Sequence, residues 1–188
     1  MRVFVILGIL VSFLFYNVEA KAEFGGHAGV HFNYGKLGTD ANGPYLFDSR
    51  AVGTFDGEFM PGWRILDGSM LVGLLFDLRF LAQLSNASTD FSGHGYSLGP
   101  GISYEILLLK LLFSYDLWLR HTFTGPNTTF KGKGYHFLLG YKIFPATSVD
   151  LEYVTGSFDS MNQTGQDFPL SPQAVKFWTI GFGLSFSF

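Results

Sequence analysis

The chain contains no cysteine, and only 14% of its 188 residues are charged. Without cysteine there is no disulfide scaffold, no cysteine-ligated metal site and no thiol nucleophile. The formal net charge is −3 and lysine and arginine form no runs, which argues against nucleic acid as a partner. The charged fraction lies well below the roughly one quarter that is usual in soluble domains. An ordinary water-exposed surface is therefore not expected.

Long apolar runs are also scarce, apart from one at the N-terminus. There, a positively charged start precedes an uncharged stretch, Val3–Tyr16, and small residues lie at and before Ala20 and Ala22. The stretch is shorter than the roughly 20 residues that a spanning helix needs. We therefore predict a cleaved signal peptide over residues 1–22, with cleavage after Ala20 left open, and one mature domain over residues 23–188.

Aromatic residues and glycine are abundant, with 22 Phe and 24 Gly, and they occur in a period-two pattern. For example, Leu74, Phe76 and Leu78 alternate with polar residues that include Asp77 and Arg79. Successive side chains of a β-strand point to opposite faces, so this alternation predicts strands with one apolar face. The pattern occurs in eight segments, at about residues 24–34, 54–59, 70–80, 96–105, 111–120, 135–143, 149–153 and 178–188.

The apolar faces carry large residues at almost every position, whereas the other faces carry Gly, Ser and isolated charges. This favours an all-β, eight-stranded antiparallel up-and-down transmembrane β-barrel, with its apolar face outward and its polar face in a narrow lumen. The alternative is a secreted soluble barrel of the lipocalin type, which would need a polar outer face that the sequence does not show. The outward residues are expected to include Leu74, Phe76, Leu117, Leu139 and Phe182. Two aromatic girdles are expected, at Phe32, Tyr34, Tyr96, Tyr135 and Trp178 and at Phe59, Tyr104, Tyr141, Phe186 and Phe188.

The connections between these segments alternate in length. Long, polar connections are predicted at about residues 35–49, 85–93, 122–134 and 158–173, and short ones at about 60–68, 106–109 and 144–148. Long loops outside and tight turns inside are typical of outer-membrane barrels. Pro61 and Pro145 are expected in turns, and Pro100 is expected to mark a bulge or a weak, edge-like place within a strand.

The C-terminal run Trp178–Phe188 ends on an aromatic residue with apolar residues at every second position before it. It resembles the terminal-strand signal that is read by the bacterial barrel-insertion machinery. The residues of this signal are Ile180, Phe182, Leu184, Phe186 and Phe188. Together with the signal peptide and the eight strands, the mature chain resembles small outer-membrane barrels of the OmpA-barrel and OmpX type. The resemblance implies a location in the outer membrane of a Gram-negative bacterium.

Isolated charges are placed in the lumen by the alternation, and we interpret them as a lumen charge network. Its members are Asp56, Glu58, Asp77, Arg79, Glu105, Lys110, Asp116, Arg120, Lys142, Asp150 and Glu152. An eight-stranded barrel is just wide enough to be filled by side chains. We therefore expect a plugged lumen whose charges pair locally, for instance Lys142 with Asp150. The alternative is a narrow cation-preferring pore.

Five histidines raise the question of catalysis or metal binding. A pairing of His94 with Ser97 can be drawn, but no catalytic signature accompanies it. His27 and His31 share one strand face at a spacing of about 13 Å, which is too far for one metal ion. We expect no catalytic residue, no cofactor and no metal site.

The predicted function is that of an integral outer-membrane barrel with a structural or surface-interaction role through four extracellular loops. The alternatives are a small cation-preferring channel and, less favoured, an enzyme that modifies lipid A. The expected partners are outer-membrane lipid, lipopolysaccharide and the barrel-insertion machinery. The chain is expected to act as a monomer, without nucleic acid.

Overall fold

The computed structural model describes residues 22–39, 50–83, 92–124, 128–163, 165–170 and 175–188. The predicted signal peptide lies almost entirely outside these ranges and stays a prediction. No helix in the described ranges is long and apolar enough to cross a membrane.

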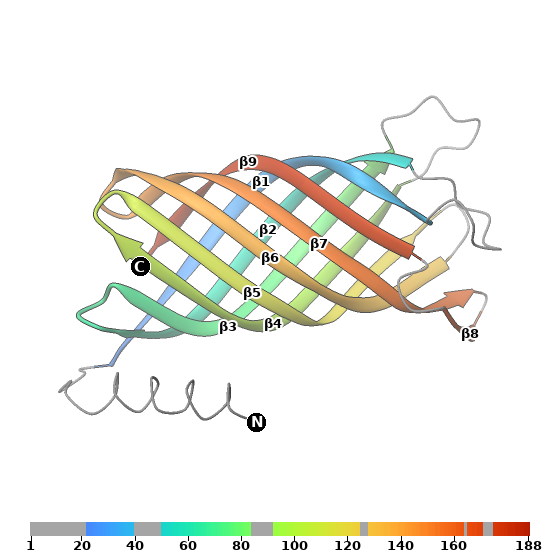
Figure 1. The fold of residues 1–188 in the computed structure, drawn as a ribbon, viewed down its shortest axis with the longest axis horizontal. Coiled ribbons are helices and arrows are strands. Elements are labelled where there is room, and N and C mark those ends of the chain that lie inside the picture. Colours follow the sequence, from blue (N-terminus) through green and yellow to red (C-terminus); the bar gives the residue numbers. More distant parts are fainter. Residues whose placement is uncertain (1–21, 40–49, 84–91, 125–127, 164, 171–174) are drawn as a thin grey trace, which may run out of the picture.

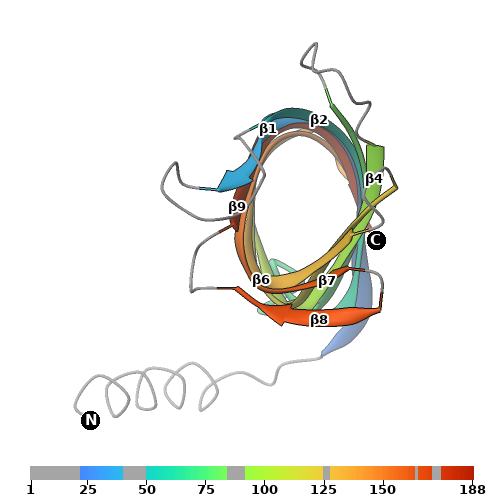
Figure 2. The ribbon, with the colours of Figure 1, turned by 90° about the vertical axis from the view of Figure 1, so that its right-hand side faces the viewer.

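Eight long strands form one closed antiparallel barrel (Figures 1 and 2). Each strand pairs with the next along the chain, and β9 closes the barrel by pairing with both β1 and β7. A short additional strand, β8, pairs with the end of β7. The predicted eight-stranded barrel is confirmed. The strands are β1 (Glu23–Thr39), β2 (Arg50–Ile65), β3 (Met70–Gln83), β4 (Ser92–Ile106), β5 (Leu109–Phe123), β6 (Thr128–Phe144), β7 (Thr147–Gln163), β8 (Gln166–Pro169) and β9 (Val175–Ser187).

The connections after β2, β4 and β6 lie at the same end of the barrel as the C-terminus, and β1, β3, β5 and β7 run to the opposite end (Figure 1). We call these the short-turn end and the long-loop end. The strands are longer than the sequence pattern predicted. Residues 60–65 continue β2, so the prediction that Pro61 lies in a turn is wrong, and much of the predicted connections 122–134 and 158–173 is also strand. Pro145 does lie in a turn.

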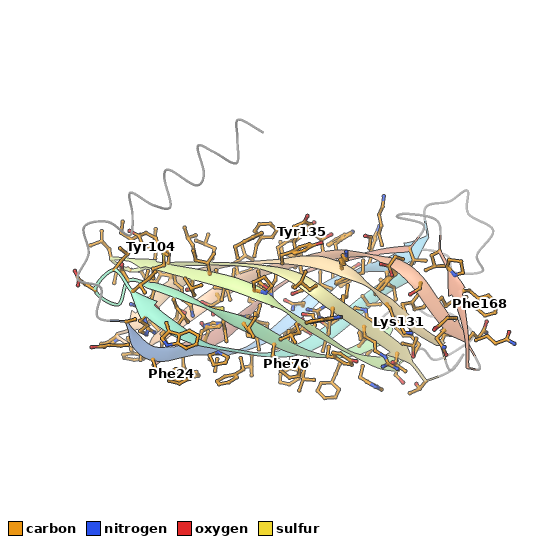
Figure 3. The ribbon with its side chains drawn as sticks, turned by 90° about the horizontal axis from the view of Figure 1, so that it is seen from below. Phe24, Phe76, Tyr104, Lys131, Tyr135 and Phe168 are labelled. Atoms are coloured by element: carbon orange, nitrogen blue, oxygen red, sulfur yellow. The ribbon has the colours of Figure 1, made fainter. Side chains whose placement is uncertain are left out.

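The outer wall carries the apolar face, as the alternation predicted (Figure 3). Leu74, Phe76, Leu117, Leu139 and Phe182, the residues expected outside, are all exposed, with Phe182 at 69%. Within the two predicted girdles, Trp178 is half-buried and the remaining aromatic residues are exposed. An isolated soluble protein rarely exposes so continuous an apolar surface.

One irregularity changes which side chains face the lumen. Strand β5 has an extra residue at Leu117–Trp118, where its register shifts against both β4 and β6. Both residues are exposed, and beyond them the alternation is inverted. The irregularity expected near Pro100 is thus confirmed, although the extra residue belongs to the neighbouring strand. Gly99 fits this place, because a Cβ atom there would lie 1.8 Å from the carbonyl oxygen of Tyr115.

The interior is layered, which the sequence analysis did not predict. A large apolar cluster fills the lumen toward the long-loop end, and we call it the upper apolar cluster. It comprises Leu37, Val52, Leu81, Leu119, Phe123, Phe130, Val154, Phe158, Leu170, Val175 and Phe177. A smaller one, the lower apolar cluster, comprises Met60, Leu71, Leu75, Leu112 and Leu138. The buried polar and charged side chains form a further network in the same lumen.

Candidate functional site: the lumen network

Most of the predicted lumen charges are enclosed by the barrel. Eight of the eleven are buried, and they come from the four strands β2, β3, β5 and β7: Asp56, Glu58, Asp77, Arg79, Lys110, Asp116, Asp150 and Glu152. The inward positions follow directly from the period of two. Three histidines that the alternation also places inside, His27, His31 and His136, are fully buried among them.

Arg79 organises the part of the network next to the upper apolar cluster. Its Nε atom donates to Asp56 Oδ2 at 2.8 Å, and its Nη2 atom donates to Asp77. The guanidinium carbon lies 5.4 Å from the ring centroid of Phe177. His121 lies 3.5 Å away, from its Nε2 atom to Nη1. Two carboxylates therefore compensate one enclosed cation, which also lies over an aromatic ring of the upper apolar cluster.

Lys110 is the second enclosed cation, and its hydrogen-bond partners are a histidine ring and a serine hydroxyl. Its Nζ atom lies 2.5 Å from His27 Nδ1 and donates to Ser185 Oγ at 2.7 Å. The other ring nitrogen of His27, Nε2, lies 2.5 Å from Glu58 Oε1. Lys110, His27 and Glu58 thus form a chain of polar contacts from β5 through β1 to β2.

Two further histidines converge on the same carboxylates. His31 Nδ1 lies 3.8 Å from both Glu58 Oε1 and Glu152 Oε1. His136 Nε2 lies 2.8 Å from Glu152 Oε1 and 3.3 Å from Glu58 Oε2. Asn33 donates to Glu152 and, at 2.8 Å, to Asp56, and so joins this cluster to the Arg79 group.

Three predicted members lie elsewhere. Lys142 and Glu105 are half-buried near the short-turn end, where Lys142 Nζ donates to Glu105 Oε2 at 2.5 Å. The predicted pairing of Lys142 with Asp150 is wrong, because Asp150 Oδ2 lies instead 3.5 Å from His31 Nε2. Arg120 is exposed on the outer wall, so its predicted place in the lumen is also wrong. The bulge at Leu117–Trp118 shifts Leu119 inward and Arg120 outward.

The pairing that an enzyme would need is not formed at His94 and Ser97. His94 is exposed on the outer wall, whereas Ser97, three residues further along β4, is buried inside the barrel. The two side chains lie on opposite faces of one strand. An acyl-transfer site cannot be assembled from these two residues.

The described network holds an excess of negative charge. Six carboxylates are buried in the lumen, but only Arg79 and Lys110 are fixed cations there. Several polar atoms among them have no hydrogen-bond partner, including both ring nitrogens of His31 and both oxygens of Asp150. Enclosed charges are costly unless they are compensated. The arrangement can therefore hold cations, either protons on the histidines or a metal ion.

Comparison of the structure with solved structures finds small outer-membrane barrels. Neisserial surface protein A superposes with a TM-score of 0.56 at 19% identity, over 89% of this chain and 99% of that chain. The attachment invasion locus protein Ail of Yersinia pestis superposes with a TM-score of 0.52 at 14% identity, over 88% and 99% of the two chains. No protein-family model and no curated protein sequence matches the chain. The chain thus has the fold of the small eight-stranded outer-membrane barrels.

Proposed function

We propose that the mature chain is an integral protein of the bacterial outer membrane with a structural or surface-interaction role, and that its lumen is closed. The observation that carries the proposal is the inverted arrangement of the wall, with large apolar side chains outside and the charged network inside. A closed barrel satisfies its backbone hydrogen bonds internally, as a lipid environment demands. The upper apolar cluster leaves little room for an aqueous path.

Fractionation of cells tests this proposal directly. The protein should separate with outer-membrane markers, and its folded form should migrate differently from the boiled form on an SDS gel. A chain that is recovered in the soluble periplasmic fraction, with one mobility before and after boiling, would contradict the proposal.

We propose that the outer wall near the long-loop end binds anionic lipid, and lipopolysaccharide in particular. Arg120 of β5 and Lys131 of β6 are direct cross-strand neighbours, and Lys133 is exposed two residues further along β6. Like charges at opposed positions destabilise a sheet unless an anion compensates them. Lys131 is bound by Asp167 of β8, at 3.1 Å, whereas the partner of Arg120 among the described residues is the hydroxyl of Tyr96, at 3.5 Å.

These cations border a hollow of about 380 Å³ on the barrel surface, next to apolar side chains. Leu117 and Trp118, the two exposed residues of the β5 bulge, line the same hollow. An acyl chain against these residues and a phosphate against Arg120 and Lys133 would match the amphipathic character of lipid A. The bulge that moves Arg120 out of the lumen thereby gives it a role at the membrane surface.

A stability assay tests the lipid partner. Lipid A should raise the melting temperature of the refolded barrel in detergent, because a ligand that binds only the folded state stabilises it. The double substitution Arg120→Glu and Lys133→Glu should remove this shift, whereas Lys36→Glu, an exposed lysine on β1, should keep it. An equal shift with dephosphorylated lipid A would exclude phosphate recognition at these residues.

We also propose that the protein is neither an enzyme nor a channel. The separation of His94 from Ser97 supports the first statement, and the apolar filling of the lumen supports the second. Both statements concern the described part of the chain.

A further inference from the structure

The cluster around His31, Glu58 and Glu152 has the composition and spacing of a metal site. Each of these residues offers one ligand atom, all of these atoms lie within 4.8 Å of one another, and all three residues are buried. They come from β1, β2 and β7, which are remote in sequence, so the closed barrel creates the cluster. We propose that the lumen binds a divalent transition-metal ion of the zinc class between His31, Glu58 and Glu152.

The unsatisfied atoms point to a ligand. Both ring nitrogens of His31 lack a hydrogen-bond partner, as do Glu58 Oε2 and Glu152 Oε1, although the three side chains are enclosed. Such atoms are rare in the interior of native proteins unless an ion or water satisfies them. Around a tetrahedral zinc ion, with bonds of about 2.0–2.1 Å, neighbouring ligand atoms lie about 3.3 Å apart. The 3.8 Å from His31 Nδ1 to Glu152 Oε1 needs only a small closure, and the ligand atoms of all three residues already lie within 4.8 Å of one another.

The surrounding contacts orient these ligands as the outer residues of a metal site do. Asp150 Oδ2 faces His31 Nε2 at 3.5 Å, which leaves Nδ1 to face the two glutamates. A histidine that ligates metal commonly donates its other ring N–H to a carboxylate in this way. Asn33 donates to one oxygen of Glu152 and so leaves Oε1 for the ion. His136 Nε2, which is 2.8 Å from Glu152 Oε1, is the nearest group for a fourth position.

Charge and ligand type select the class of metal. A dication would compensate part of the excess of carboxylates in the described network. Imidazole together with carboxylate favours zinc and related transition metals, whereas calcium and magnesium prefer all-oxygen sites. The upper apolar cluster closes the route from the long-loop end to His31, Glu58 and Glu152. We therefore expect the ion to enter while the barrel folds.

The first experiment measures retained metal in the mature chain. The protein is refolded in detergent with zinc sulfate, freed of unbound ion, and analysed by elemental mass spectrometry. One zinc ion per barrel is expected for the wild type and for the control His94→Gln, because His94 is exposed outside the cluster. His31→Gln and Glu152→Gln should lose it. Absence of zinc from the folded wild type, or equal retention by all variants, would overturn the proposal.

A second measurement does not depend on the folding of the variants. Refolding of the wild type with cobalt(II) should give the visible absorption of a low-coordinate site with nitrogen and oxygen ligands, and zinc should displace it. A spectrum of hexaaqua cobalt alone would overturn the proposal. Because neither readout involves the membrane, failure here leaves the proposed outer-membrane role unaffected.

Discussion

A charge on the outer wall tests the membrane arrangement most directly, and Phe182 is the best place for it. Phe182 is 69% exposed on β9, between the outward residues Phe32 of β1 and Leu151 of β7. Phe188 lies six positions further along the chain. At about 3.3 Å per residue and a strand tilt of about 40°, this places Phe182 about 15 Å along the membrane normal from the short-turn end. The apolar band of such barrels is about 25 Å tall, so Phe182 lies near its middle.

Phe182→Arg should lower the free energy of unfolding by about 2–4 kcal/mol, the cost of an arginine near the midplane of a barrel wall. The matched control is Phe186→Arg on the same face of the same strand, about 5 Å from Phe188 by the same geometry. Near the interface the cost should fall to about 0–1 kcal/mol. Both variants lose one phenyl ring, so the difference between them isolates depth.

The assay is a urea titration of the barrel in phospholipid vesicles, followed by tryptophan fluorescence and by mobility on unboiled gels. Vesicles are preferred because a bilayer has a defined apolar thickness. Equal losses of unfolding free energy in the two variants, or no loss in Phe182→Arg, would refute the conclusion that this wall faces lipid.

Four further outcomes are expected. Phe188→Ala should hardly change the stability of the refolded barrel but should lower its yield in the outer membrane, and an unchanged yield would show that the C-terminus is not a targeting signal. Planar-bilayer recordings should show no steady conductance, whereas cation-selective steps abolished by Glu152→Ala would establish a pore. Arg79→Met leaves two carboxylates enclosed without their cation and should lower the free energy of unfolding by about 3–5 kcal/mol in a urea titration. The hydrogen bond from Asn162 lowers the pKa of Asp167. The ordering that this contact gives to β8 should therefore be present above about pH 4 and lost as the pH falls below it. Hydrogen exchange of the β7–β8 hairpin measures this ordering, and unchanged protection in acid would contradict the prediction.

The barrel itself could be predicted from the sequence because alternation is a property of strand geometry and needs no knowledge of the neighbours. The direction of the faces followed from the size of the residues on each. The rule fails where the backbone departs from regular geometry. The bulge in β5 places Leu117 and Trp118 on one side, and it inverts everything that follows, including Arg120.

The lower apolar cluster could not be predicted for a related reason. Where both faces of a strand are apolar, as in Leu74–Leu75–Phe76 and Leu111–Leu112–Phe113, the alternation carries no signal. Such short unbroken runs were the available sign of a filled lumen, since the middle residues Leu75 and Leu112 are buried.

The partners within the charge network depend on distances across the lumen. Sequence neighbours across a short hairpin, such as Lys142 and Asp150, do not meet, because each finds a partner on another strand. The spacing of His27 and His31 along β1 overstates the separation of their side chains. In the structure Glu58 lies between them, at 2.5 Å from one ring and 3.8 Å from the other. Only the closure of the barrel brings Glu152 to the same place.

The length of the strands has a consequence for how the protein meets its surroundings. β1, β6 and β7 have 17 residues each, and such a strand rises roughly 40 Å along the barrel axis, well above the height of about 25 Å that lipid covers. If the short turns lie at the inner surface of the membrane, the part of each strand that lipid does not cover lies at the long-loop end. There the upper apolar cluster fills the inside of the barrel and packs the strands of the wall together. Under the proposed outer-membrane location, this packed wall would extend beyond the lipid surface.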